Sequence, residues 1–129
     1  MKEIRAYIRR DKVTPVVETL RAAGAPEVSI IEIHPLGYGY EASGFVPHKA
    51  SVVDRYRHLA IVKLEIVCAD TQLERLIHVI EDQCTGAGGD GMIFASEVVE
   101  AVRIRDRARG EPALLDERRQ GRTGADART

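Results

Sequence analysis

The sequence contains few of the residues on which several classes of protein depend. Tryptophan is absent, aromatic residues make up 5% of the 129 residues, and there are two cysteines. So few aromatic side chains leave little material for stacking the bases of a single-stranded nucleic acid. Two cysteines without CxxC spacing also exclude a disulfide scaffold, and we expect Cys68 and Cys84 to be buried or half-buried thiols.

Long apolar runs and an excess of one charge are missing too. No stretch of about 18 apolar residues occurs, which argues against a membrane-spanning helix. The first ten residues carry charges where a signal peptide needs an apolar run, so we expect a cytoplasmic protein. The 19 Lys and Arg residues nearly cancel the 20 Asp and Glu residues, which leaves no basic field for binding nucleic acid.

What the chain does contain is a regular alternation of strand and helix periods. Apolar and polar residues alternate over 3–9, which predicts a half-buried strand, and 28–33 and 59–68 predict a second and a third strand. The segments 92–96 and 97–105 predict two more short strands or one hairpin.

Two amphipathic helices are expected between these strands. Thr14, followed by proline, predicts the N-cap of the first, and Gly24 predicts its end. Thr71 and Glu74 fit a capping box at the start of the second. The order predicts an α+β, ferredoxin-like βαββαβ sandwich over residues 1–115, with both helices on one face of an antiparallel sheet. Oligomerisation would cover the other, half-polar face.

Two segments depart from this pattern. Residues 34–57 form a long loop without clean periodicity, and such loops are usually functional. The loop carries Tyr38, Tyr40, Phe45 and Tyr56, which we expect either to bind a partner or to pack back against the oligomer. Residues 116–129 have no apolar side chain larger than alanine, which predicts a disordered C-terminal tail.

One combination of residues suggests an anion or nucleotide site. The glycine-rich segment TGAGGDG at 85–91 would let backbone N–H groups approach a phosphate. Arg103 and Arg105 alternate on the predicted final strand, so both would point to one face and clamp a phosphate. The alternative is an ordinary turn and a surface salt-bridge network with Asp90 or Asp106.

Other chemistries have weaker support. His48 and His58 could join Asp54 in a metal site, but no ligand spacing supports it. Ser43, His48 and Asp54 could be written as a catalytic triad, but all three fall in one loop without a nucleophile elbow. We therefore expect no metal and no catalytic residue.

Taken in order, these motifs resemble the PII signal-transduction family over roughly residues 1–114. LAIVKLEIVCAD resembles its third strand, TGAGGDGMIF its B-loop (TG-x-x-GDGK-I-F), and AVRIRDRARGE its C-loop (RIRTGERGE). VSIIEI with Gly37 resembles its second strand and the opening of its T-loop. The resemblance implies a homotrimer that binds an adenine nucleotide in the clefts between subunits and controls a partner through the T-loop.

The resemblance also implies a set of site residues. Gly89, Asp90 and Gly91 fall on the phosphate-binding B-loop, Ser29 near the adenine, and Gly37 at the base of the T-loop. Glu65 and Val67 fall on the third-strand wall of the site, and Met92 follows the GDG motif. Arg103 and Arg105 fall on the C-loop arginines.

The chain departs from the family pattern where cations and an amide are expected. Met92 replaces the B-loop lysine, and Ile61 replaces a third-strand lysine. Tyr38 and Gly39 replace an arginine and a glutamine at the T-loop base, and the T-loop tyrosine that is covalently modified is not recognisable. We therefore expect AMP, ADP or a cyclic nucleotide to bind in preference to ATP, and 2-oxoglutarate not to be sensed.

This pattern resembles a divergent, PII-like branch that accompanies transporters and carbon-uptake systems and in part responds to bicarbonate. We therefore expect a non-catalytic regulator of a membrane transporter or metabolic enzyme, with bicarbonate as a second ligand held by His34, His48 or a loop cation. One alternative is a slow nucleotide hydrolase with Asp90 or Glu65 as base. Another is a metal-binding trimer that uses the loop histidines.

Overall fold

The computed structural model describes residues 1–33, 61–85 and 91–115. Within these ranges the strands are β1 (Lys2–Arg9), β2 (Ser29–Glu32), β3 (Ile61–Cys68) and β4 (Met92–Glu97), and the helices are α1 (Val13–Ala22) and α3 (Leu73–Cys84). Short 3-10 turns occupy Arg10–Lys12, Asp70–Gln72 and Glu111–Leu114. The strands form one sheet in the order β2-β3-β1-β4, and every neighbouring pair is antiparallel.

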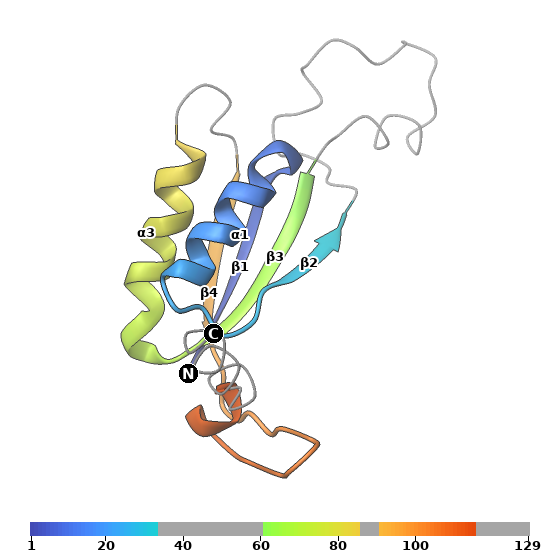
Figure 1. The fold of residues 1–129 in the computed structure, drawn as a ribbon, viewed down its shortest axis with the longest axis vertical. Coiled ribbons are helices and arrows are strands. Elements are labelled where there is room, and N and C mark those ends of the chain that lie inside the picture. The colour runs from blue at the N-terminus through green and yellow to red at the C-terminus, as the bar shows by residue number, and fades with distance from the viewer. Residues whose placement is uncertain (34–60, 86–90, 116–129) are drawn as a thin grey trace, which may run out of the picture.

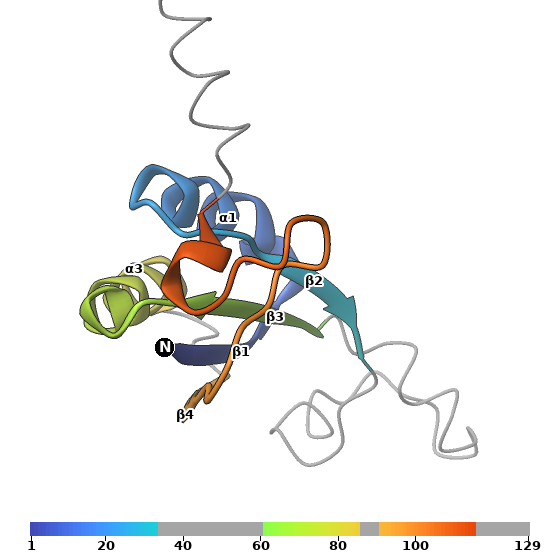
Figure 2. The same cartoon turned by 90° about the horizontal axis from the view of Figure 1, so that it is seen from below.

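The core lies between the two helices and one face of this sheet (Figures 1 and 2). Alternation along β1 turns Ile4, Ala6 and Ile8 toward the helices, where each is at most 3% exposed. The helices bury two large residues each against this layer, Val16 and Leu20 from α1 and Leu76 and Ile80 from α3. The predicted ferredoxin-like sandwich, with both helices on one face, is therefore confirmed.

The predicted helix starts are wrong in detail. α1 begins at Val13, and Thr14 lies inside its first turn instead of capping it. The 3-10 turn Arg10–Lys12 leads directly into the helix, so the N–H of Val13 already donates to the carbonyl oxygen of Arg10. At the second helix Gln72 takes the place of the predicted capping box. Its Oε1 accepts from the N–H of Ala69 at 3.1 Å, while its Nε2 donates to the carbonyl oxygen of Gly24 at 3.1 Å.

The end of α1 is as predicted. Gly24 has a φ of +87°, a left-handed conformation that favours glycine. The N–H of Ala25 donates to the carbonyl oxygen of Leu20 at 3.0 Å, which satisfies one of the last helical acceptors.

The predicted strand over 97–105 is wrong. β4 ends at Glu97, and in residues 98–110 the only further strand pairing is the isolated bridge between Val102 and Arg109 around a turn. In the single chain Val99 and Ile104 are 94% and 93% exposed, so nothing within the described residues covers these two apolar side chains. Arg103 and Arg105 therefore lie on a turn, not on alternate positions of a strand.

The sheet face opposite the helices carries the polar residues expected there. Arg5, Tyr7, Lys63 and Glu65 pair in register across β1 and β3. Phe94 joins them from β4: its ring contacts that of Tyr7 edge-on, and the Arg5 guanidinium lies 5.8 Å from its centroid. Phe94 is still 39% exposed and Met92 48%.

Candidate functional site

A pocket of about 400 Å³ brings together five residues that the sequence assigns to the nucleotide site: Ser29, Glu65, Val67, Arg103 and Arg105. Ser29 lies directly opposite Glu65 in the β2–β3 pair, and Glu65 and Val67 share a face of β3. The two arginines arrive from the 103–115 segment, which folds back beneath the sheet (Figure 2). We call this the Arg103 pocket. It is also lined by Glu3, Pro26, Glu27, Ala113, Leu114 and Leu115.

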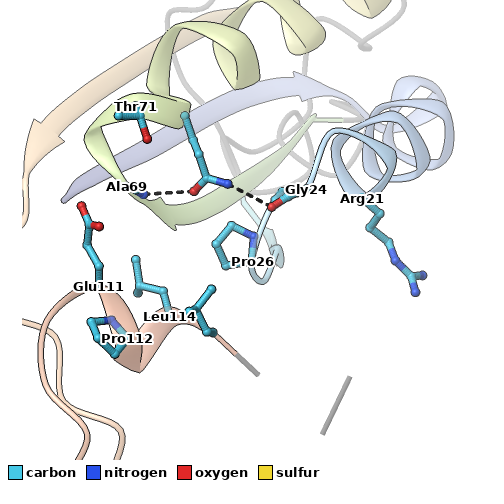
Figure 3. Close-up of a pocket in the computed structure, with 11 residues that line it drawn as sticks. Arg21, Gly24, Pro26, Ala69, Thr71, Glu111, Pro112 and Leu114 are labelled. Atoms are coloured by element: carbon cyan, nitrogen blue, oxygen red, sulfur yellow. Dashed lines mark hydrogen bonds between the residues drawn. The ribbon is translucent and has the colours of Figure 1, made fainter. Parts of the chain in front are cut away.

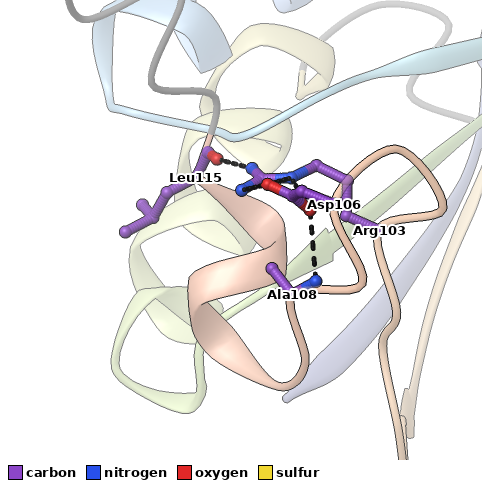
Figure 4. Close-up of polar contacts among 4 residues, drawn as sticks. All are labelled: Arg103, Asp106, Ala108 and Leu115. Carbon is purple, nitrogen blue, oxygen red and sulfur yellow. Dashed lines mark hydrogen bonds and ion pairs between the residues drawn. The ribbon is translucent and has the colours of Figure 1, made fainter.

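Arg103 is held by contacts within its own segment (Figure 4). Its Nε lies 2.9 and 3.0 Å from the two carboxylate oxygens of Asp106, its Nη2 donates to Oδ2 at 2.7 Å, and its Nη1 donates to the carbonyl oxygen of Leu115. The same carboxylate accepts from the N–H of Ala108 at 3.1 Å. These bonds hold the pKa of Asp106 far below its usual range. Arg103 therefore forms the salt bridge with Asp106 that the sequence offered as the alternative to a phosphate clamp.

Arg105 differs from Arg103 although it lines the same pocket. Its side chain is exposed, and it forms no ion pair with the residues that the structure describes. It also contributes to lowering the pKa of Asp106. Of the two arginines, Arg105 is thus the one that can turn toward an incoming anion without breaking an ion pair to another described residue.

Carboxylates make up much of the remaining charge of the pocket. Glu3, Glu27 and Glu65 all line it. Glu65 accepts from Lys63 Nζ at 2.7 Å, and this bond raises the pKa of Lys63. Glu3 lies 3.6 Å from the Nε of Arg5. The pocket therefore suits hydrogen-bond donors, such as those of a base or a ribose, better than a dense cluster of phosphates.

Gly91 and Met92, also assigned to the site, lie at the opposite end of the sheet. Met92 opens β4 and pairs with Tyr7, whereas β4 ends at Glu97 opposite Lys2, next to the 98–115 segment (Figure 1). A Cβ on Gly91 would collide with the carbonyl oxygen of Tyr7, so the close approach requires glycine here. Tyr7, Gly91 and Met92 line a hollow of about 140 Å³, which we call the Met92 hollow, together with Lys12 and Cys84.

The other predicted site residues lie outside the described ranges. These are Gly37, Gly89 and Asp90 of the nucleotide site, and Tyr38, Tyr40, Phe45 and Tyr56 of the partner-binding loop. Ile61, at the position of the missing third-strand lysine, is described and is 1% exposed, so it belongs to the interior and not to a binding surface.

A larger pocket of about 630 Å³ was not predicted from the sequence (Figure 3). It lies between the end of α1, the start of α3 and the turn Glu111–Leu114, and it shares Pro26, Leu114 and Leu115 with the Arg103 pocket. The sequence signal nearest to this pocket is the end of the first helix at Gly24. The turn that forms the other wall of the pocket has no periodic pattern. The same holds for Glu3 and Glu27, which line the Arg103 pocket without belonging to a motif.

The described part of the chain gives little support for a metal site or for a reactive thiol. No group of three or more His, Cys, Asp or Glu residues there could hold a metal ion, and His34, His48 and His58 fall outside it. Cys68 is buried and Cys84 half-buried, as predicted, and burial raises the pKa of both thiols. None of the described helices is long and apolar enough to cross a membrane.

Comparison with known proteins agrees with the fold and with the motifs. Residues 1–108 match the family model described as Nitrogen regulatory protein P-II. The chain is 36% identical over 115 residues to the Nitrogen regulatory protein P-II of Cereibacter sphaeroides, covering 88% of this chain and 100% of that protein. It is 35% identical over 117 residues to the protein of that name from Azospirillum brasilense, with 88% and 100% covered. It is also 35% identical over 113 residues to the Nitrogen fixation nifHD region GlnB-like protein 1 of Methanobacterium ivanovii, with 85% and 99% covered.

A four-stranded antiparallel sheet with two helices on one face, and a pocket of arginines and carboxylates at one end, defines a small α+β domain. The chain belongs to the P-II family of nitrogen regulatory proteins. The resemblance drawn from the motifs is thereby confirmed, as is the expectation of a regulatory signalling protein and not an enzyme.

Proposed function

We propose that this protein is a regulator that binds an adenine nucleotide, AMP or ADP in preference to ATP, in clefts between the subunits of a homotrimer. The nucleotide biases the conformation of the loop at 34–57, and the loop binds or releases a transporter or metabolic enzyme, with a carbon-uptake system as the favoured target. Such control needs only that the nucleotide binds one loop state more tightly than the other.

One observation carries this proposal: the predicted site residues fall into two groups at opposite ends of one sheet. Arg103, Arg105, Ser29 and Glu65 gather at one end, and Gly91 and Met92 lie at the other. Among the described residues of a single chain, the two groups line separate pockets. Two neighbouring copies, each offering a different end, would complete the site.

The open sheet face supports assembly of copies. Phe94 of the edge strand β4 is a large apolar residue, 39% exposed, whose ring contacts that of Tyr7 on a face without a covering layer among the described residues. Burying this apolar surface between copies would remove it from water.

The charges around Met92 and in the Arg103 pocket favour a nucleotide with few phosphates. Met92 offers no cation at the end of the glycine-rich segment, and the Arg103 pocket contains three carboxylates. Each further phosphate adds negative charge that these carboxylates repel, and the cations of the Met92 hollow are Arg9 and Lys12. Bicarbonate is proposed as a second ligand at the 34–57 loop, whose residues lie outside the described ranges.

Assembly and binding are tested together with Phe94→Glu, which introduces a charge into the open sheet face. Light scattering after size-exclusion chromatography should report a trimer for the native chain and a monomer for the variant. Calorimetry should show that the variant also loses ADP binding. His78→Glu, a change at a side chain that is 70% exposed on α3, is the control and should keep both properties. A native monomer, or a monomeric variant with full ADP affinity, would contradict the proposal.

A further inference from the structure

The Asp106 carboxylate binds the same N–H groups of Arg103 that a phosphate would need. Its carboxylate faces both the Nε and the Nη2 of Arg103, at 2.9, 3.0 and 2.7 Å, the side-on arrangement in which a guanidinium also binds a phosphate. Carboxylate and phosphate oxygens thus compete for the same two donors. Arg103 is only 18% exposed in this arrangement.

The surrounding turn keeps Asp106 in that place. The N–H of Arg103 donates to the carbonyl oxygen of Ala108 at 2.9 Å, and the N–H of Arg107 donates to that of Arg103 at 2.8 Å. The Asp106 carboxylate itself accepts from the N–H of Ala108. The aspartate is therefore fixed before any ligand arrives, and a competing anion must displace an already ordered pair.

From this geometry we infer that Asp106 is a specificity-determining residue that keeps Arg103 from the phosphates of the ligand. The inference rests on the proposed function, because it specifies how that same pocket limits the number of phosphates it accepts. Arg105 is left as the guanidinium that contacts the anion first. Each additional phosphate then adds little to the binding affinity. The next cation, Arg103, is neutralised by Asp106, and the nearby carboxylates repel a phosphate: Glu3, Glu27 and Glu65.

Asp106→Asn tests the inference with little change in shape. The amide oxygen can still accept from the N–H of Ala108, but the negative charge that holds Arg103 is lost. By calorimetry at low salt we expect ADP to bind about fivefold tighter, AMP about twofold tighter and adenosine equally well, since a freed arginine gains charge-assisted bonds only to phosphates.

A matched control is present in the same segment. Glu100 accepts from the N–H of Ala101 at 3.1 Å and pairs with Arg109 at 3.4 Å, so it also combines a backbone bond with an arginine pair, but it does not line the pocket. Glu100→Gln should leave the affinity for all three ligands unchanged. The double variant Arg103→Gln/Asp106→Asn should lose the gain seen with Asp106→Asn alone.

The outcomes separate the inference from the proposed function. If the native chain binds ADP and Asp106→Asn binds it equally or more weakly, the inference is wrong and the proposed function stands. If neither protein binds an adenine nucleotide, both are wrong. If Asp106→Asn does not fold, single variants of the native chain decide: Arg105→Gln should weaken ADP binding and Arg103→Gln should not, whereas equal losses would overturn the inference.

Discussion

Ser29 of the edge strand β2 lies directly opposite Glu65 of β3, and both line the Arg103 pocket. Because side chains alternate along a strand, the neighbouring Ile30 belongs to the other face of the sheet, where it pairs with Leu64. One strand position thus reaches the candidate site and the next does not.

This alternation predicts opposite effects for two equivalent substitutions. Ser29→Phe should fill the pocket and weaken ADP binding by more than about tenfold, whereas Ile30→Phe should leave the affinity unchanged. Both positions are exposed, so each change should alter the free energy of unfolding by no more than about 0.5 kcal/mol. Calorimetry and urea denaturation measure the two quantities, and equal losses of affinity would place the ligand elsewhere.

Gly91 should be essential for stability. Its Cα approaches the carbonyl oxygen of Tyr7 so closely that a Cβ requires the backbone of β1 or β4 to move. Gly91→Ala should therefore reduce the free energy of unfolding by about 1–3 kcal/mol, as other overpacked sites do. Urea denaturation measures the loss, and Ser96→Ala on the exposed part of β4 is a control that should change it by less than about 0.5 kcal/mol. An unchanged Gly91→Ala protein would contradict the packing described here.

We expect the residue at position 92, here Met92, to determine how much the additional phosphates of ATP contribute to its affinity. Met92→Lys adds a flexible cation at an exposed position, and we expect it to increase ATP affinity about tenfold relative to AMP through new charge-assisted bonds. Met92→Leu keeps the apolar character and should preserve the native order of affinities. If the lysine variant shows the native ratio of ATP to AMP affinity, Met92 does not face the phosphates.

The Arg103–Asp106 pair predicts a specific dependence of stability on pH. The folded pKa of Asp106 is lowered below its unfolded value of about 3.9, so the aspartate stabilises the fold above that pH, and the contribution is lost as the pH falls toward the folded pKa. The melting temperature of the native chain should exceed that of Asp106→Asn at pH 6. The difference should shrink below about pH 4. A difference that stays constant from pH 6 to pH 3 would show that the charge of Asp106 is not responsible.

The fold could be predicted largely because its signals are local. Alternation in 3–9 and the apolar stripes of the two helices each reflect one buried face, and the structure buries those faces. The helix starts could not be predicted, because a 3-10 turn before α1 replaces the N-cap at Thr14, and Gln72 bonds to Gly24, 48 residues away. Bonds between residues so distant in sequence leave no periodic pattern.

The site shows the same division. Ser29, Glu65, Val67, Arg103 and Arg105 were assigned by their resemblance to family motifs, and they do line one pocket. The predicted strand over 97–105, on which Arg103 and Arg105 would alternate, was wrong, because the segment forms an isolated bridge around a turn and Val102 and Ile104 are exposed in the single chain. Which partner Arg103 takes depends on how that turn closes, and the sequence left that choice open between Asp90 and Asp106.

The most direct test of the account is calorimetry of the native chain with AMP, ADP and ATP, each with and without 2-oxoglutarate and bicarbonate. We predict that AMP or ADP binds more tightly than ATP and that 2-oxoglutarate changes none of the three affinities. Tight ATP binding that 2-oxoglutarate strengthens would contradict it, and would mean that the roles given to Met92, Gly39 and Ile61 are wrong.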